Sequence, residues 1–149
     1  MDLHRFTIEE LMIGNMYGEA RMIEGDMVED DREYLAIGCV VRNRVLSLRF
    51  PNSYHEVILQ RRQFSWANEG DPNRSMVIEF LMNGKDTKTY KRMKAWAKAI
   101  IENKTTDFSN GADHYVAQWL YEKEEKQHWI DDMKITAVWG GHVFLRSKQ

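Results

Sequence analysis

The sequence is poor in cysteine and proline and has no long apolar run, and each shortage excludes a class of protein. Cys39 is the one cysteine in 149 residues, so no disulfide can form within the chain, and its apolar neighbours predict a buried, inert thiol. With two prolines and no repetitive or Gly/Ser-rich stretch, the chain lacks any segment typical of a linker, which predicts a single domain over residues 1–149. No stretch is apolar enough for membrane insertion, and the polar N-terminus lacks the pattern of a signal peptide.

Neither sign of charge is in large excess. The net charge is −2 and the isoelectric point is near 6.2, which argues against a protein that binds nucleic acid by neutralising its phosphates. A helical nucleic-acid-associated protein that uses the basic stretches 61–64 and 90–98 is therefore the weaker alternative. The histidines are scattered without HxxxH or HExxH spacing, and there is no glycine-rich phosphate loop, so neither a metal nor a cofactor is predicted.

Apolar spacing and capping signals predict helices over the first two thirds of the chain. Thr7 followed by Glu10 forms a capping box, which places the start of the first helix near Ile8. Ser53 with Glu56 forms a second such box. The expected helices begin near Ile8, span 31–48 and 53–59, run from the Asp71–Pro72 pair to Gly84, and cover 87–103.

The last third of the chain has a different character. Residues 107–120 combine turn residues with aromatic and β-branched ones, and 134–145 read as two short extended runs broken by Gly140 and Gly141. The predicted fold class is therefore α+β and predominantly helical, with a small β lobe at the C-terminal end. His142, directly after the glycines, is expected to tie their turn to the helical core.

One acidic residue occupies an unexpected position on the first helix. At 100° per residue, Glu19 falls within roughly 20° of Ile8 and Met12 on the helix surface, so it extends the apolar face. Burial raises the pKa of a carboxyl group, and a carboxylic acid that stays protonated near neutral pH can act as a general acid. Gly18 and Ala20 are expected to leave space beside it for a substrate. The alternative is a structural ion pair with one of three arginines: Arg21, Arg42 or Arg44.

Four motifs occur in an order that resembles a known family. They are "YGEAR" (17–21), "AIGCVVRNRVLSLRFPNSYHEVILQRRQFSW" (36–66), "ADHYV" (112–116) and "GGHVFL" (140–145). Together they resemble the SleB-type, spore-cortex-lytic cell wall hydrolases, and the resemblance extends roughly from Leu11 to Leu145. It implies a lysozyme-like fold with a glycan groove, and a muramidase or lytic transglycosylase that acts on bacterial peptidoglycan.

The resemblance also implies roles for particular residues. The glutamate of the "EAR" motif, Glu19, is the catalytic residue of the family. The "QFS" and "HY" motifs border the groove, and we add the tryptophan after "QFS" as a ring that could stack on sugar. The predicted substrate-binding residues are Gln63, Phe64, Ser65, Trp66, His114 and Tyr115. Gln63 is the better polar contact, whereas Phe64 is expected mainly to pack, and Tyr115 can orient Glu19.

Two features depart from the family pattern. The asparagine that often follows the "HY" pair is replaced by Val116, Ala117 and Gln118. The acidic stretch 24–31 is longer than the connection usual in the family. Both differences concern the predicted groove, so they bear on the detail of the substrate more than on the reaction.

The expected reaction is cleavage of the β-1,4 bond between N-acetylmuramic acid and N-acetylglucosamine. Glu19 would protonate the glycosidic oxygen and, in a transglycosylase, then deprotonate the C6 hydroxyl that attacks C1. Hydrolysis usually needs a second carboxylate, and the candidates are Glu24, Asp26, Glu29, Glu69 and Asp113. No partner at a motif position stands out among them, which favours the transglycosylase.

The expected partner is the glycan strand of peptidoglycan, and nothing in the sequence calls for more than a monomer. A non-catalytic peptidoglycan-binding module on the same fold is the alternative to the enzyme. In the absence of a signal peptide, the enzyme is expected to be a holin-released phage endolysin or a trimmed secreted protein.

Overall fold

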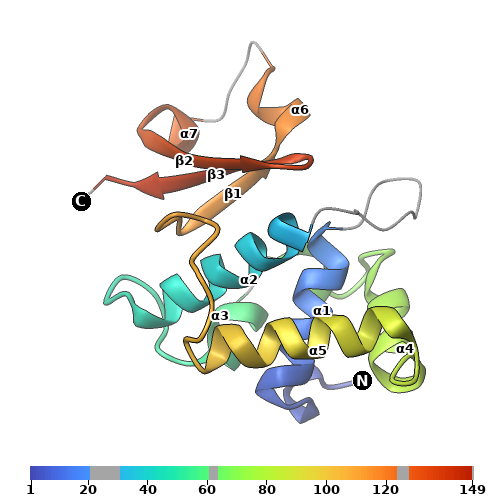
Figure 1. Cartoon of the computed structure of the whole chain (residues 1–149). Helices are drawn as coiled ribbons and strands as arrows, with labels where there is room; N and C mark the ends of the chain where they lie inside the picture. The colour runs from blue at the N-terminus through green and yellow to red at the C-terminus, as the bar shows by residue number, and fades with distance from the viewer. Residues whose placement is uncertain (21–30, 61–63, 124–127, 149) are drawn as a thin grey trace.

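The computed structural model describes residues 1–20, 31–60, 64–123 and 128–148. A group of helices lies beneath a small antiparallel sheet, and the sheet covers one side of the second helix (Figure 1). The helical elements of the lower layer are η1 (Leu3–Arg5), α1 (Ile8–Ala20), α2 (Asp31–Leu46), α3 (Tyr54–Leu59), η2 (Ser65–Ala67), α4 (Arg74–Asn83) and α5 (Lys88–Ile101). The upper layer contains β1 (His114–Ala117), α6 (Gln118–Tyr121), α7 (His128–Asp131), β2 (Met133–Trp139) and β3 (His142–Ser147).

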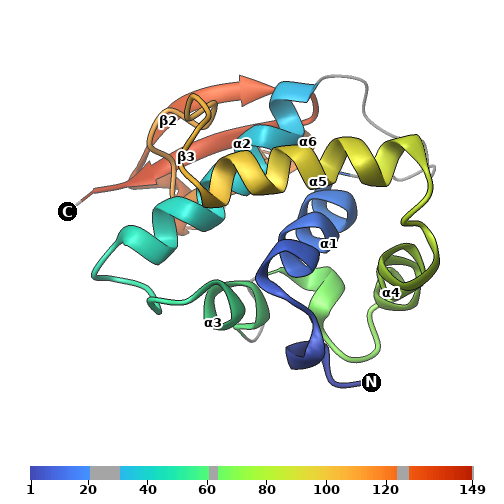
Figure 2. The same ribbon diagram turned by 60° about the horizontal axis from the view of Figure 1, so that its bottom comes forward.

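Helix α1 lies at the centre of the lower layer. It contacts α2, α3, α4 and α5, which surround it when the molecule is turned (Figure 2). The predicted capping box is confirmed: the Thr7 hydroxyl accepts from the Glu10 amide at 3.1 Å, and the Glu10 carboxylate accepts from the Thr7 amide at 3.0 Å. Leu11, Met12 and Met16 are fully buried, and each contributes about 1.5–3 kcal/mol of hydrophobic stabilisation.

Helix α2 connects the two layers. Ile37 and Val41 are fully buried in the main core, as their spacing predicts, and Cys39 is buried beside them. Burial raises the pKa of the Cys39 thiol to about 12, which confirms a thiol that is inert at neutral pH. The prediction that the helix extends to Leu48 is wrong, because α2 ends at Leu46 and Leu48 is fully exposed in the turn before Pro51.

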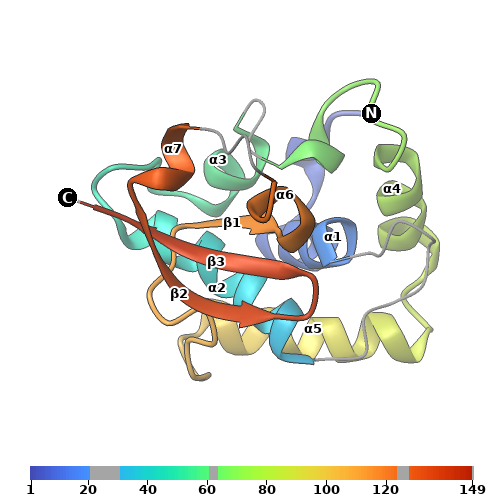
Figure 3. The same ribbon diagram turned by 90° about the horizontal axis from the view of Figure 1, so that it is seen from above.

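The sheet has the strand order β1-β3-β2, with both pairings antiparallel. The β2–β3 hairpin turns at the two glycines, as predicted, and Gly140 has a φ of +56°. On one face, Tyr115 and Phe144 are register partners that join the main core, while Val143 and Leu145 face a second cluster with Ile130. Figure 3 shows this sheet from above, lying across α2.

The predicted fold class is confirmed: the structure is α+β and mostly helical, with the small sheet at the C-terminal end. The predicted helix start at Asp71–Pro72 is wrong, because α4 begins at Arg74 with Asn73 as its N-cap residue. Asp71 instead accepts a hydrogen bond from the Asn73 amide at 2.8 Å and shapes the turn before the helix. Among the described residues, no helix has the length and apolar character needed to span a bilayer.

Candidate functional site

Glu19 lies in the last turn of α1, where this helix meets the sheet. Its carboxylate Oε1 accepts a hydrogen bond from the Tyr115 hydroxyl at 2.8 Å. Burial raises the pKa of Glu19 from 4.5 to about 7, against the Tyr115 hydrogen bond and the charge of His142, which both lower it. A carboxylic acid with this pKa can give a proton at neutral pH and take it back.

Trp66 forms the wall behind this turn of α1. A Cβ atom on Gly18 would lie 2.9 Å from Cγ of Trp66, so the space that Gly18 leaves is occupied by the indole and is not open to a substrate. Trp66 is fully buried, and its Nε1 donates to Oδ1 of Asn15 at 2.9 Å. Contrary to the sequence-based predictions, Trp66 therefore offers no ring face to a ligand, and Gly18 serves packing.

Aromatic rings hold Tyr115 in place. Phe64 stacks on it with ring centroids 6.1 Å apart, and His142 meets it edge-on at 5.4 Å and 88°. Phe64 is itself buried and lies under the guanidinium of Arg44, 5.2 Å from its ring centroid. Burial and the negative charge of Glu19 raise the pKa of Tyr115 well above 10, so its hydroxyl remains a hydrogen-bond donor over the whole range in which Glu19 titrates.

Glu33 is the site residue that the sequence reasoning missed. It is 1% exposed on the first turn of α2, where it accepts from the Gly141 amide at 2.7 Å and pairs with Nδ1 of His142 at 3.3 Å. These bonds confirm that His142 ties the glycine turn to the helical core. The sequence does contain a signal for Glu33, because it precedes the buried Ile37 by one helical turn and so places an acid on the apolar face of the helix. The same conflict singled out Glu19.

The other predicted substrate residues are dispersed. Gln63 lies outside the described residues, and Ser65 is exposed at the start of η2. His114 points away from its neighbour Tyr115 because successive strand residues face opposite sides. Its Nδ1 lies 2.8 Å from Oδ1 of Asp113, and its ring is 5.9 Å from that of Phe50. Of the "HY" pair, only Tyr115 is hydrogen-bonded to Glu19.

The candidate second carboxylates divide into three groups. Three of them, Glu24, Asp26 and Glu29, lie outside the described residues. Glu69 is exposed and lines a separate cavity beside the first residues of the chain. Burial alone would raise the pKa of Asp113, but hydrogen bonds from His114 and Ser147 outweigh it and hold the pKa well below its usual range. Asp113 is thus a charged structural acceptor.

The structure also gives the contacts of two of the three arginines proposed as ion-pair partners of Glu19. Arg21 lies outside the described residues. Arg42 donates to Oδ1 of Asn103 at 2.9 Å. Nε of Arg44 donates to the carbonyl of Asp113 at 2.6 Å, and its charge lowers the pKa of Glu19 without offsetting the effect of burial. Among the described residues, no three metal-ligating side chains gather into a group that could hold a metal ion.

Comparison with known families shows which family the chain resembles. The model of the family described as Cell Wall Hydrolase matches residues 28–145. The matched range includes Glu33, Tyr115 and His142, whereas Glu19 lies before its first residue. No curated protein and no solved structure matched the chain in the corresponding searches.

Proposed function

The chain belongs to the cell wall hydrolase family, and from this premise we propose that it cleaves the glycan strands of bacterial peptidoglycan with Glu19 as its general acid and base. The scissile bond is the β-1,4 link from N-acetylmuramic acid to N-acetylglucosamine. The observation that carries the proposal is the pKa of Glu19, which burial raises to about 7 while Tyr115 donates to its Oε1. SleB-type specificity, suggested by the motifs, belongs to the same proposal.

The hydrogen bond to Glu19 defines which oxygen carries the proton. Since Oε1 accepts from the Tyr115 hydroxyl, the acidic proton of the neutral form resides on Oε2. That proton passes to the glycosidic oxygen as positive charge develops on the muramyl C1, and the resulting carboxylate is stabilised by the same hydrogen bond. Tyr115 thereby keeps Glu19 in one orientation through both halves of the reaction.

A lytic transglycosylase needs one carboxylate, and we favour this outcome. After bond cleavage, the Glu19 carboxylate takes the proton of the muramyl C6 hydroxyl as that oxygen attacks C1, which leaves a 1,6-anhydro end. Among the described carboxylates, Asp113 is bound by Ser147 and His114, and Glu33 by Gly141 and His142. A hydrolase would need a different second carboxylate. The candidates are Asp71, whose charge acts on Glu19 and raises its pKa, and the carboxylates of the acidic stretch 24–31.

The test is digestion of purified peptidoglycan by the wild type and by Glu19→Gln, with the released fragments identified by mass spectrometry. Gln keeps the shape of the side chain and removes the titrating proton. The matched control is Glu79→Gln, an exposed glutamate on α4. We expect anhydro-muramyl ends from the wild type and the control, and none from Glu19→Gln.

Each other outcome has a definite meaning. Reducing muramic acid ends would identify a hydrolase that still depends on Glu19. Cleavage by Glu19→Gln at the wild-type rate would remove Glu19 from the mechanism. Binding to peptidoglycan without cleavage by any variant would favour the non-catalytic binding module on the same fold.

A further inference from the structure

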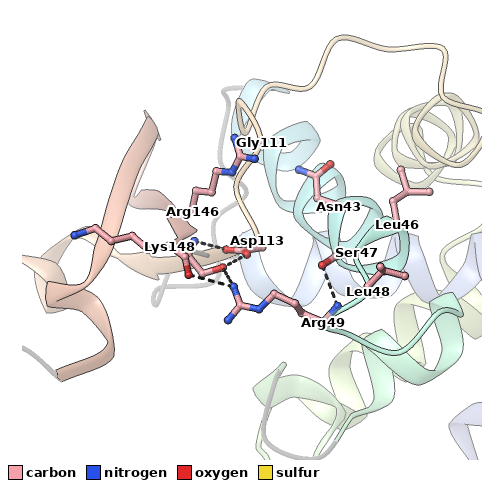
Figure 4. Close-up of a pocket in the computed structure, with 10 residues that line it drawn as sticks. Asn43, Leu46, Ser47, Leu48, Arg49, Gly111, Asp113, Arg146 and Lys148 are labelled. Atoms are coloured by element: carbon pink, nitrogen blue, oxygen red, sulfur yellow. Dashed lines mark hydrogen bonds between the residues drawn. The ribbon is translucent and has the colours of Figure 1, made fainter.

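A cavity of about 850 Å³ lies between the end of α2 and the end of β3. Figure 4 shows its lining side chains, which come from the end of α2 and the turn after it, from the segment before β1, and from the end of β3 with the residue after it. Asp113 is part of the lining, whereas Glu19 is not. The cavity is therefore a neighbour of the Glu19 site and is separate from it.

The lining is strongly basic for a chain of net charge −2. Arg49, Arg146 and Lys148 line the cavity together with a single carboxylate, Asp113. Oδ1 of Asp113 accepts a hydrogen bond from the Ser147 amide at 2.9 Å and lies 2.8 Å from Nδ1 of His114. Within the part of the chain that the structure describes, neither arginine has a carboxylate partner. This local excess of positive charge favours an anionic ligand.

One of these arginines is hydrogen-bonded at the cavity. Nη1 of Arg49 donates to Oγ of Ser147 at 2.7 Å and faces the carbonyl of Lys148 at 3.5 Å. A guanidinium has five N–H donors in a planar fork, and this geometry matches a carboxylate through two parallel hydrogen bonds. The contact with Ser147 therefore holds Arg49 at the cavity with donors remaining for a ligand.

The cavity also has apolar walls. Leu46 and Leu48 line it and are 72% and 105% exposed, so both can still gain stability by covering apolar groups of a ligand. A ligand that suits the whole lining carries carboxylates and small alkyl groups close together. A bare inorganic anion would use only the basic part.

The chain places this cavity close to Glu19. Asp113, at the cavity, and Tyr115, which donates to Glu19, are two residues apart at the start of β1. Extended residues advance about 3.3 Å each, so roughly 7 Å separates the two backbone positions. A short branch on a glycan strand bound at Glu19 can cover that distance.

We propose that this cavity binds the peptide stem that branches from muramic acid in the strand cleaved at Glu19, an assignment that rests on the proposed function. The stem places two adjacent carboxylate-bearing residues, glutamate and diaminopimelate, between alanines that carry methyl groups. Arg49 and Arg146 bind the carboxylates, and the exposed leucines contact the methyl groups. The enzyme thereby prefers strands that carry stems over bare glycan.

The first experiment measures binding alone, so that it does not depend on cleavage. The probe is the free stem tetrapeptide of alanine, glutamate, diaminopimelate and alanine, titrated calorimetrically into the full chain. Arg49→Gln combined with Arg146→Gln is expected to bind it at least about tenfold more weakly, since hydrogen bonds between charged groups are lost. Arg146→Gln alone, which keeps the Arg49–Ser147 contact, is expected to show an intermediate loss.

The matched control is Lys88→Gln, an exposed cation at the start of α5, at the end of that helix far from the cavity. This variant removes one positive charge, as Arg146→Gln alone does, and should bind the tetrapeptide like the wild type. Circular dichroism establishes that every variant is folded. An oligomer of glycerol phosphate serves as a second probe, because a phosphate polymer shares the negative charge and lacks the carboxylates.

The outcomes separate this proposal from the proposed function. Wild-type binding of the tetrapeptide that the double variant loses supports the stem site, even if Glu19→Gln cleaves normally. Absence of tetrapeptide binding, or equal binding by the double variant, overturns it. Binding of glycerol phosphate in preference to the tetrapeptide also overturns it. In cleavage assays, the ratio of kcat/KM for stem-bearing over amidase-stripped strands should fall toward one in the double variant.

Discussion

Replacement of Tyr115 by Phe tests whether the hydrogen bond at Glu19 sets the acidity of the site. The Tyr115 hydroxyl stabilises the charged form of Glu19, which lowers a pKa that burial raises to about 7. Its removal leaves the carboxylate less stable, so the pKa of Glu19 rises. A hydrogen bond to a charged group contributes about 1.5–3 kcal/mol, and a pKa unit corresponds to about 1.36 kcal/mol, so the expected rise is about one to two units.

The assay is the rate of peptidoglycan cleavage as a function of pH. Activity that needs a protonated Glu19 is lost as the pH rises through its pKa, so in Tyr115→Phe the alkaline limb should move to higher pH by about one to two units. The control is Tyr54→Phe, which removes a hydroxyl from α3 and should leave the limb in place. A limb that stays where it was, or moves to lower pH, would refute the reasoning.

Three further predictions concern stability, each measured as a free energy of unfolding in urea. The pKa of Glu19 is about 7 in the folded protein and 4.5 in the unfolded chain. Its contribution to the free energy of unfolding is therefore complete below about pH 4.5 and is lost as the pH rises through 7. Relative to Glu19→Gln, the wild type should lose about 3 kcal/mol of stability by pH 8. Gly140→Ala should destabilise by at least about 2 kcal/mol, because φ is +56° and the new Cβ would overlap Oε2 of Glu33. Gly141→Ala, which has open space around its new Cβ, should be near neutral. Glu33→Ala should cost about 2–3 kcal/mol by leaving the Gly141 amide and His142 unpaired; a loss below about 0.5 kcal/mol would contradict that role.

The features that could be predicted from the sequence are those determined by neighbouring residues. Thr7 and Ser53 begin their helices by bonding amides three residues away, and the inward face of α5 follows from its helical period alone. Glu19 also stands out locally, because an acid that continues an apolar face conflicts with its surroundings. Its role in the chemistry stays a prediction.

The features that escaped prediction depend on contacts between distant parts of the chain. Nothing within a few residues of Trp66 indicates that its indole fills the space beside Gly18. Glu33 and His142 are 109 positions apart. The local sequence around either residue does not indicate that the two pair. Leu48 has the spacing of a buried residue, yet the turn before Pro51 carries it away from the core.

The hydrogen bond between Glu19 and Tyr115 joins residues 96 positions apart, and this separation has a consequence for synthesis. Glu19 belongs to α1, which leaves the ribosome before β1 and β3, and β1 pairs with β3. In a nascent chain, Tyr115 cannot be held against Glu19 by the complete sheet until β3 has emerged and paired, because long-range contacts form only when both partners are present. If Glu19 acts as proposed, activity should appear only after β3 has been made, and products cut short before β3 should be inactive.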